Sequence, residues 1–168
     1  LKPDAVVVVA TIRALRYHGG ATKKTEFSEV NVEAVKKGFA NLEKHIENIQ
    51  LLGIQPVVAI NHFATDSQEE LDWLIDACEK LGVKAIIADE FTMGGEGMKT
   101  LAAEVVNATE SYGNHFTPLY DLNLSIKEKV EILAKKFYGA EKVNFEAKAN
   151  TQLKMIQELG MDNLPVCM

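Results

Sequence analysis

Cysteine is scarce in this chain, which has two cysteines among its 168 residues, Cys78 and Cys167. Neither stands in a CxxC pair or in another metal-binding spacing, so the sequence predicts neither a metal site nor a disulfide-stapled fold. Two isolated thiols are typical of a reducing compartment. We therefore expect a cytoplasmic protein in which both thiols are free and act as small core residues, Cys78 on a helix and Cys167 in a terminal strand.

Long apolar runs and an excess of basic charge are also absent. The N-terminal apolar run, residues 5–10, is far shorter than the roughly 20 residues of a membrane span, and it lacks the basic segment and cleavage site of a signal peptide. The chain has 18 basic and 24 acidic residues and a net charge of −6. This charge is a poor match for nucleic acid or an anionic membrane, so we expect neither as a partner.

Two catalytic patterns are missing as well. No Gly-Lys-Ser/Thr phosphate loop occurs anywhere in the chain. No serine or cysteine stands on a turn of the nucleophile type, so the sequence predicts neither a catalytic residue nor a metal ligand in this chain. The first residue is Leu1 rather than methionine, and residues 164–168 end the chain on an apolar run. We expect a piece of a longer protein.

Three apolar, β-branched runs predict strands that are buried on both faces, as in a parallel sheet: Ala5–Ala10, Val57–Ile60 and Ala85–Ala88. Residues 143–146 are a weaker strand candidate, and residues 165–168 would begin another. Apolar stripes at helical spacing predict five helices, over residues 35–49, 71–81, 101–108, 126–137 and 153–159.

Helix caps and irregular stretches complete the pattern. Asp66 or Ser67 would cap the second helix, and Ser125 with Glu128 forms a capping box at the fourth. Residues 16–30 and 111–124 are expected to be irregular. The alternation predicts an α/β fold: a parallel sheet with βα crossovers in three layers, as in P-loop NTPase-like and Rossmann-like folds. We expect a ligand-binding part over residues 1–110 and a more helical part over residues 111–168.

Ligands of open α/β sheets bind beyond the carboxyl ends of the strands. Polar and aromatic residues follow all three predicted strands, over residues 11–20, 61–66 and 89–97. The side-chain amide of Asn61 can donate and accept at a ring edge, as in the base-reading loop of nucleotide enzymes. Asp66 serves either as a ligand or only as a helix cap, and His62 is expected on the surface.

The loop after the third predicted strand begins with Glu90 and Phe91. Phe63 and Phe91 follow neighbouring strands and could clamp a planar ring, although spacing alone favours two residues that cap the core. Gly94 and Gly95 open a helix, where they either admit an anion or a flat ring or merely form a tight turn.

Two arginines follow the first predicted strand. Arg13 could bind phosphate or carboxylate, and so could Arg16, unless Arg16 lies on a solvated helix face.

Six segments carry a resemblance that runs in order along the whole chain: residues 1–20, 38–49, 58–66, 94–97, 118–122 and 163–168. They resemble the formate–tetrahydrofolate ligases, also called formyltetrahydrofolate synthetases. The resemblance implies an ATP-dependent enzyme that joins formate and tetrahydrofolate through formyl phosphate to give 10-formyltetrahydrofolate. It implies ATP with Mg²⁺ as cofactor, a cytoplasmic homo-oligomer, and a chain that continues with the rest of the ligase, including its phosphate loop.

The resemblance also implies roles for single residues. It places Asn61, Phe63, Thr65 and Asp66 on the family's ligand loop, and Phe91 where the family usually has tryptophan. The two phenylalanines would then sandwich a pterin or a purine. Three departures weaken the match: Ala64 replaces the usual proline, Phe91 the tryptophan, and Met93 a common lysine.

Two other functions remain open at this stage. One is a non-catalytic nucleotide- or folate-binding module, which would need the same pocket. The other is an assembly domain, which a large exposed apolar stripe on the helix over residues 39–49 would favour.

Overall fold

The computed structural model describes residues 2–23, 26–111 and 115–168. Residues 24, 25 and 112–114, which fall in the two stretches predicted to be irregular, lie outside the described residues. The chain divides into two compact units, unit 1 over Leu1–Phe116 and unit 2 over Thr117–Met168.

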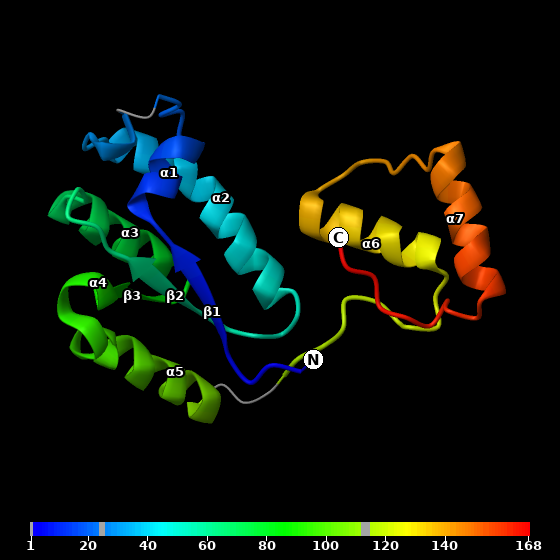
Figure 1. Cartoon of the computed structure of the whole chain (residues 1–168). Coiled ribbons are helices and arrows are strands. Elements are labelled where there is room, and N and C mark those ends of the chain that lie inside the picture. The colour runs from blue at the N-terminus through cyan, green and yellow to red at the C-terminus, as the bar shows by residue number, and fades with distance from the viewer. Residues whose placement is uncertain (1, 24–25, 112–114) are drawn as a thin grey trace. The chain divides into compact units, whose positions relative to one another are not determined.

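A three-stranded parallel sheet lies at the centre of unit 1 (Figure 1). Its strands are β1 (Val6–Ala10), β2 (Pro56–Asn61) and β3 (Lys84–Ala88), in the spatial order β1-β2-β3. All three predicted strands and their parallel arrangement are confirmed. The middle strand is the most deeply buried, since every residue from Pro56 to Ile60 is buried.

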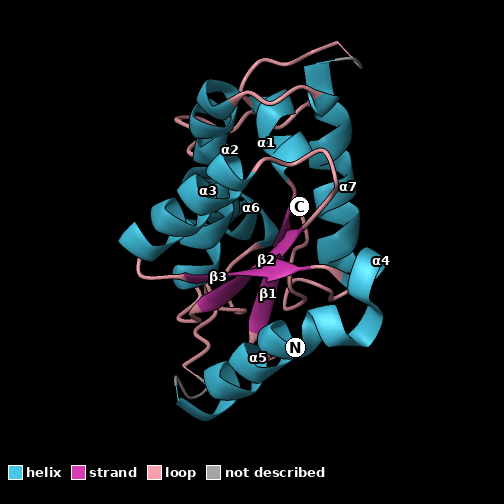
Figure 2. Cartoon of the chain, turned by 90° about the vertical axis from the view of Figure 1, so that its left-hand side faces the viewer, coloured by secondary structure: helices cyan, strands magenta, loops and turns pink. Residues whose placement is uncertain are grey.

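Helices cover both faces of the sheet (Figure 2). Val58 and Ile60 face one way and pack in a core with residues of α2 (Val32–Gln50) and α3 (Gln68–Lys80). Val57 and Ala59 face the other way and pack against α5 (Lys99–Ser111). This alternation follows from the two-residue period of a strand, and it gives the three-layer architecture that the sequence predicts.

Short polar motifs fix where the helices begin. The Ser67 side chain accepts a hydrogen bond from the Glu70 N–H, and the Glu70 side chain accepts one from the Ser67 N–H, so Ser67 rather than Asp66 caps α3. Ser125 and Glu128 form the predicted capping box at α6 (Ile126–Tyr138). Each box satisfies backbone donors that a helix leaves unpaired.

The apolar stripe of α2 is buried. Val35, Phe39, Leu42 and Ile46 all belong to the core of unit 1. The stripe therefore does not form the exposed surface that an assembly role would need.

Four short elements lie in the connections of unit 1. They are α1 (Ile12–His18), the 3-10 turn η1 (Glu26–Ser28) and α4 (Glu90–Met93), which is followed by a second 3-10 turn, η2 (Gly94–Met98). The prediction of a long loop over residues 16–30 was wrong in its first part, because α1 extends through His18. With only seven residues, α1 is too short to show a helical stripe in the sequence.

Unit 2 contains α6 and α7 (Ala147–Glu158). The buried Lys129 on α6 donates through Nζ to the carbonyls of Asp162 and Leu164. The Tyr120 hydroxyl donates to the Val166 carbonyl and accepts from the Val166 N–H, at 3.1 and 2.8 Å. These contacts fix the end of the chain within unit 2.

Three further predictions from the sequence were wrong. Residues 143–146 and 165–168 form no strand. Cys167 is exposed rather than buried in a core, whereas Cys78 is buried as predicted and both thiols are free. The first strand is not buried on both faces, since Val7 and Val9 are 39% and 67% exposed. β1 is an edge strand of the described sheet, and α5 covers β2 and β3 more fully than it covers β1.

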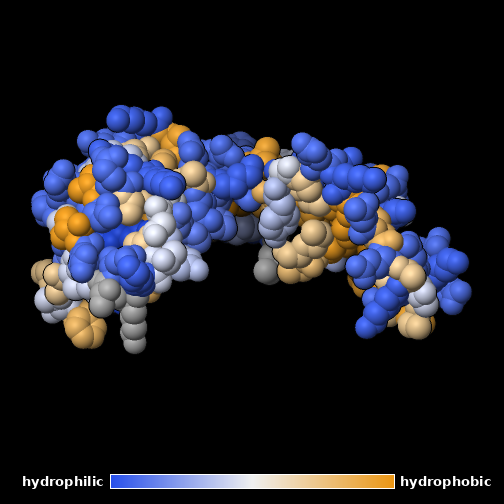
Figure 3. Space-filling view, turned by 90° about the horizontal axis from the view of Figure 1, so that it is seen from above, coloured by the Kyte–Doolittle hydropathy of each residue, from blue (hydrophilic) through white to orange (hydrophobic). Residues whose placement is uncertain are grey.

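The surface of unit 1 seen in Figure 3 is mostly hydrophilic, with scattered apolar residues. No helix in the described part of the chain is long and apolar enough to cross a membrane.

Candidate functional site

The three strands of unit 1 end together at one edge of the sheet. Ala10 pairs with Ile60, and Asn61 pairs with Ala88, so the three strands end within one residue of one another. This confirms the prediction that the three polar segments follow strands ending at a common carboxyl edge. The segments after β1, β2 and β3 therefore form the candidate site, in the position where parallel sheets bind ligands.

The first loop brings Arg13 to Phe63. Thr11 caps α1 by accepting a hydrogen bond from the Ala14 N–H at 3.0 Å, and the exposed Arg13 lies in the first turn of the helix. The Arg13 guanidinium carbon lies 4.9 Å from the centre of the Phe63 ring. This is a cation–π contact that joins two predicted site residues from different loops.

The second loop, residues 62–67, is closed by its own hydrogen bonds. The Phe63 N–H donates to Asp66 Oδ2 at 2.8 Å, and the Asp66 N–H donates back to the Phe63 carbonyl at 2.9 Å. The other carboxylate oxygen, Asp66 Oδ1, is buried and has no hydrogen-bond partner among the described residues. Asp66 therefore holds the turn that presents Phe63, and it is not the helix cap.

Asn61 precedes this turn, and Thr65 lies within it. Asn61 ends β2 and is partly buried, and its side chain makes no hydrogen bond to any residue that the structure describes. The Thr65 side chain is exposed, while its carbonyl accepts a hydrogen bond from Arg16 Nη2 at 3.1 Å. An amide with free donors and acceptors at a strand end suits the reading of a ring edge.

The third loop presents an aromatic ring to solvent. Asp89 caps α4 by accepting a hydrogen bond from the Thr92 N–H, and Glu90 and Phe91 form the exposed start of this helix. Phe91 is 95% exposed, and Phe63 is 36% exposed. A side chain this exposed does not cap the core, so core packing does not explain Phe91.

The glycines of this loop differ in what the fold requires of them. Gly94 has a φ of +56°, and a Cβ atom on Gly97 would lie 2.3 Å from the Asp89 carbonyl oxygen. Both positions therefore need glycine for the turn itself. Gly95 has neither a positive φ nor a nearby atom, since nothing lies within 4 Å of the place where its Cβ would be.

Sequence reasoning treated His62 as a surface residue, but it is only partly exposed. Its Nδ1 lies 3.7 Å from Asp89 Oδ2, which links the loops after β2 and β3. The His62 N–H also donates to the Ala88 carbonyl at 3.1 Å. His62 and Asp89 are direct neighbours of predicted site residues, and only the pairing of β2 with β3 could bring them together.

Arg16 is neither a free ligand for phosphate nor part of a solvated helix face. Its side chain is fully buried and forms a two-pronged ion pair with Glu70, through Nε at 2.8 Å and Nη2 at 2.6 Å. Burial acts to raise the pKa of Glu70, but hydrogen bonds from Arg16, the Asn31 N–H and Ser67 outweigh it and lower the pKa to about 2. Sequence reasoning missed Glu70, although the Ser67-x-x-Glu70 spacing marks it as a capping residue.

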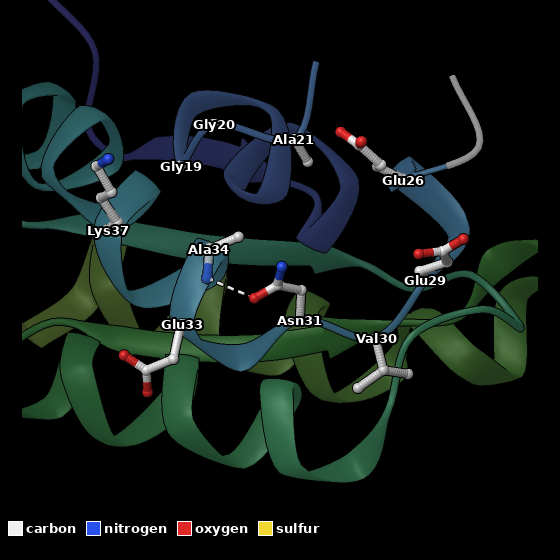
Figure 4. Close-up of a pocket in the computed structure, with 10 residues that line it drawn as sticks. All are labelled: Gly19, Gly20, Ala21, Glu26, Glu29, Val30, Asn31, Glu33, Ala34 and Lys37. Carbon is white, nitrogen blue, oxygen red and sulfur yellow. Dashed lines mark hydrogen bonds between the residues drawn. The ribbon is translucent and has the colours of Figure 1, made fainter. Parts of the chain in front are cut away.

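A hollow of about 350 Å³ lies between the end of α1 and the start of α2 (Figure 4). Its lining includes Gly19 and Gly20, three acidic residues and one basic residue: Glu26, Glu29, Glu33 and Lys37. None of the predicted site residues lines it. Its acidic lining does not suit the anionic substrates that the resemblance implies.

Comparison with known proteins gives one consistent result. The family model described as formate–tetrahydrofolate ligase matches residues 1–168. The chain is 49% identical over 166 residues to the formate–tetrahydrofolate ligase of Renibacterium salmoninarum, a match that covers 99% of this chain and 29% of that protein. The chain thus spans less than a third of the length of this relative. Because the family model matches the chain from end to end, the chain belongs to the formate–tetrahydrofolate ligase family.

Proposed function

We propose that this chain supplies the ring-binding wall of a ligase that joins formate to tetrahydrofolate at the expense of ATP. The whole protein would form 10-formyltetrahydrofolate through formyl phosphate. Membership of the family supports the reaction. The arrangement of the sheet edge supports the role of this part of the protein.

The observation that supports this role most is the exposure of two aromatic rings. Phe63 and Phe91 follow β2 and β3, which are hydrogen-bonded neighbours, and both rings reach solvent at the carboxyl edge. A large apolar side chain that is 95% exposed contributes little to folding. Its placement is accounted for if a planar ligand covers it, since stacking on an aromatic ring is favourable.

Each of the other site residues then has a role that fits its position. Asn61 presents a free amide to the edge of the bound ring, and Thr65 and Asp66 form the turn below it. Gly94 and Gly95 let the backbone come close to the ring, with Glu90 beside them. Arg13 covers part of Phe63 and places a positive charge beside it, which suits a ring that carries an anionic tail, either the glutamate of a folate or the phosphates of ATP.

The phosphate chemistry is assigned elsewhere in the ligase. No Gly-Lys-Ser/Thr phosphate loop occurs in this chain, and Mg²⁺ accompanies the phosphates that such a loop holds. The residues here bind and orient the ring.

Calorimetric titration with tetrahydrofolate and with ATP tests the proposal, on the protein expressed as the full product of its gene. Phe91→Ala should weaken the binding of one of the two ligands. The ligand that is affected identifies which ring, pterin or adenine, stacks on Phe91. Phe91→Trp should hold or improve affinity, because it enlarges the stacking face. The matched control is Tyr138→Ala, which removes an exposed aromatic ring from unit 2. Unchanged affinity of Phe91→Ala for both ligands would refute the ring-binding role.

A further inference from the structure

Arg16 and Glu70 form a fully buried ion pair next to the candidate site. Neither side chain has exposed surface. Arg16 donates to the Glu70 carboxylate through Nε at 2.8 Å and through Nη2 at 2.6 Å. Removing two charges from water is costly, and an apolar pair of similar size often stabilises a protein as well or better. Stability alone therefore does not account for this pair.

The ion pair makes hydrogen bonds to the C-terminal end of the loop over residues 62–67, at Thr65 and Ser67. Arg16 Nη2 donates to the Thr65 carbonyl at 3.1 Å. Glu70 Oε2 accepts hydrogen bonds from the Ser67 N–H at 3.0 Å and from the Ser67 hydroxyl at 2.8 Å. The residues on both sides of Asp66 are thus tied to one buried charge pair.

The same pair also holds a second segment. Arg16 Nη1 donates to the Phe27 carbonyl at 2.7 Å, and Glu70 Oε1 accepts from the Asn31 N–H at 2.9 Å. Beyond their contact with each other, the two side chains thus make five hydrogen bonds, to groups of Phe27, Asn31, Thr65 and Ser67. If the 62–67 loop shifted, a buried charged group would lose a hydrogen bond, which costs free energy.

The turn transmits this constraint to Phe63. The hydrogen bonds between Phe63 and Asp66 make residues 63–66 a closed unit, so fixing Thr65 also fixes the position of the Phe63 backbone. Helix α1 also contacts the Phe63 ring directly, because Arg13, three residues before Arg16, lies over that ring. Residues three apart lie on the same side of a helix. One helix therefore contacts both the backbone of this loop and its aromatic ring.

We propose that Arg16 and Glu70 are positioning residues of the ring-binding site, which hold the 62–67 loop in the geometry where Phe63 meets the planar ligand. This inference rests on the proposed function. Neither side chain touches the ligand. Their effect is to keep the binding-competent loop as the populated state, since apparent affinity falls in proportion to the fraction of molecules in that state.

Arg16→Lys is the variant that separates positioning from folding. The lysine keeps the charge next to Glu70, but its single ammonium cannot reach both carboxylate oxygens and the Thr65 and Phe27 carbonyls at once. We expect affinity for the stacking ligand to fall roughly tenfold, the equivalent of one hydrogen bond to a charged group. Amide hydrogen exchange at Phe63 and Asp66 should become faster. Both measurements are made on the full gene product well below its unfolding temperature, with tetrahydrofolate and ATP as probes.

Two controls are matched to this variant. Ile46→Val removes one buried methyl group from the core near the other end of α2, so it lowers stability without touching the loop. Its affinity and its exchange at Phe63 should equal those of the unmodified protein. Ser67→Ala removes the hydroxyl that donates to Glu70 Oε2 and that accepts the cap hydrogen bond from the Glu70 N–H, but it leaves the Arg16–Glu70 pair and the Thr65 contact intact. It should therefore weaken binding by less than Arg16→Lys.

The outcomes are distinguishable. If Phe63→Ala leaves binding of both probes unchanged, the proposed function fails and this inference fails with it. If Phe63→Ala weakens binding while Arg16→Lys and Ser67→Ala bind normally, the proposed function stands and the positioning role is refuted. If Arg16→Lys does not fold, Ser67→Ala decides by itself: faster exchange at Phe63 with weaker binding supports the role, and unchanged values overturn it.

Discussion

The buried carboxylate of Glu70 makes the stability of unit 1 depend on pH in a way that can be measured. Although burial raises its pKa, hydrogen bonds from Arg16, Asn31 and Ser67 lower it from 4.5 to about 2. A carboxyl whose pKa is lower in the folded chain than in the unfolded chain binds its proton less readily when folded. Its contribution to stability is therefore complete above pH about 4.5 and is lost as the pH falls toward 2.

The difference between these two pKa values sets the size of the effect. At 1.36 kcal/mol for each pKa unit, the loss between pH 4.5 and pH 2 is at most about 3 kcal/mol. A small domain has a free energy of unfolding of only about 5–15 kcal/mol, so a change of this size is easily resolved. Glu70→Gln removes the titrating group and should flatten this part of the pH profile.

Urea unfolding followed by tryptophan fluorescence is a suitable assay. Trp73 is the single tryptophan of the chain, lies on α3 with Glu70, and packs edge-on against Phe39 at 5.5 Å between ring centres. Unfolding should be measured from pH 7 down to pH 3 for the unmodified chain, for Glu70→Gln, and for Glu69→Gln as an exposed control on the same helix. The difference between the unmodified chain and Glu70→Gln should shrink as the pH falls, while Glu69→Gln follows the unmodified chain. Equal slopes for all three proteins would refute the reasoning.

Four other predictions concern the site and the thiols. Phe63→Ala should weaken ligand binding by about 5- to 150-fold, the equivalent of the ~1–3 kcal/mol of one stacked ring, and should change urea stability little; a stability loss of ~3–5 kcal/mol with unchanged affinity would instead make the ring a core residue. Gly95→Ala should unfold at the same urea concentration as the unmodified chain, because its Cβ meets no atom, yet it should weaken ligand binding; normal binding would remove Gly95 from the site. The 168-residue chain by itself should form no 10-formyltetrahydrofolate from ATP, formate and tetrahydrofolate, because the sequence has no phosphate loop; product in a coupled assay would contradict this. Alkylation without reductant should modify only Cys167 in the folded chain and both thiols after unfolding, because burial raises the pKa of Cys78 to about 11; a mass that shows no modification after unfolding would indicate a disulfide.

The regular elements of unit 1 could be predicted from the sequence because their signals are local. The run Val57–Ile60 is apolar at every position, as a strand covered on both faces must be, and Ser67-x-x-Glu70 marks the start of α3 within four residues. In unit 2, Ser125-x-x-Glu128 marks the start of α6 in the same way. The common edge for Asn61 and the residues after β3 follows from the same signals, because parallel strands joined by helices end on the same side. Signals of this kind fail for short elements: α1 has too few residues for a stripe, and the apolar residues at 143 and 145 found no partner strand.

The tertiary structure decided everything that depends on partners far apart in the chain. Arg16 and Glu70 are 54 positions apart. Only the folded chain brings Arg16 of α1 to Glu70 of α3, so that an arginine expected either to bind a ligand or to lie on a solvated helix face becomes half of a buried ion pair. The same holds for Arg13 over Phe63, for His62 beside Asp89, and for the open face of β1 at Val9. The sequence by itself determined which segments become strands and helices and which loops lie at the sheet edge, because hydrophobic period and capping act within a few residues. It did not determine which side chains meet, because burial, charge pairing and exposure are set by distances between segments, and these exist only once the chain has folded.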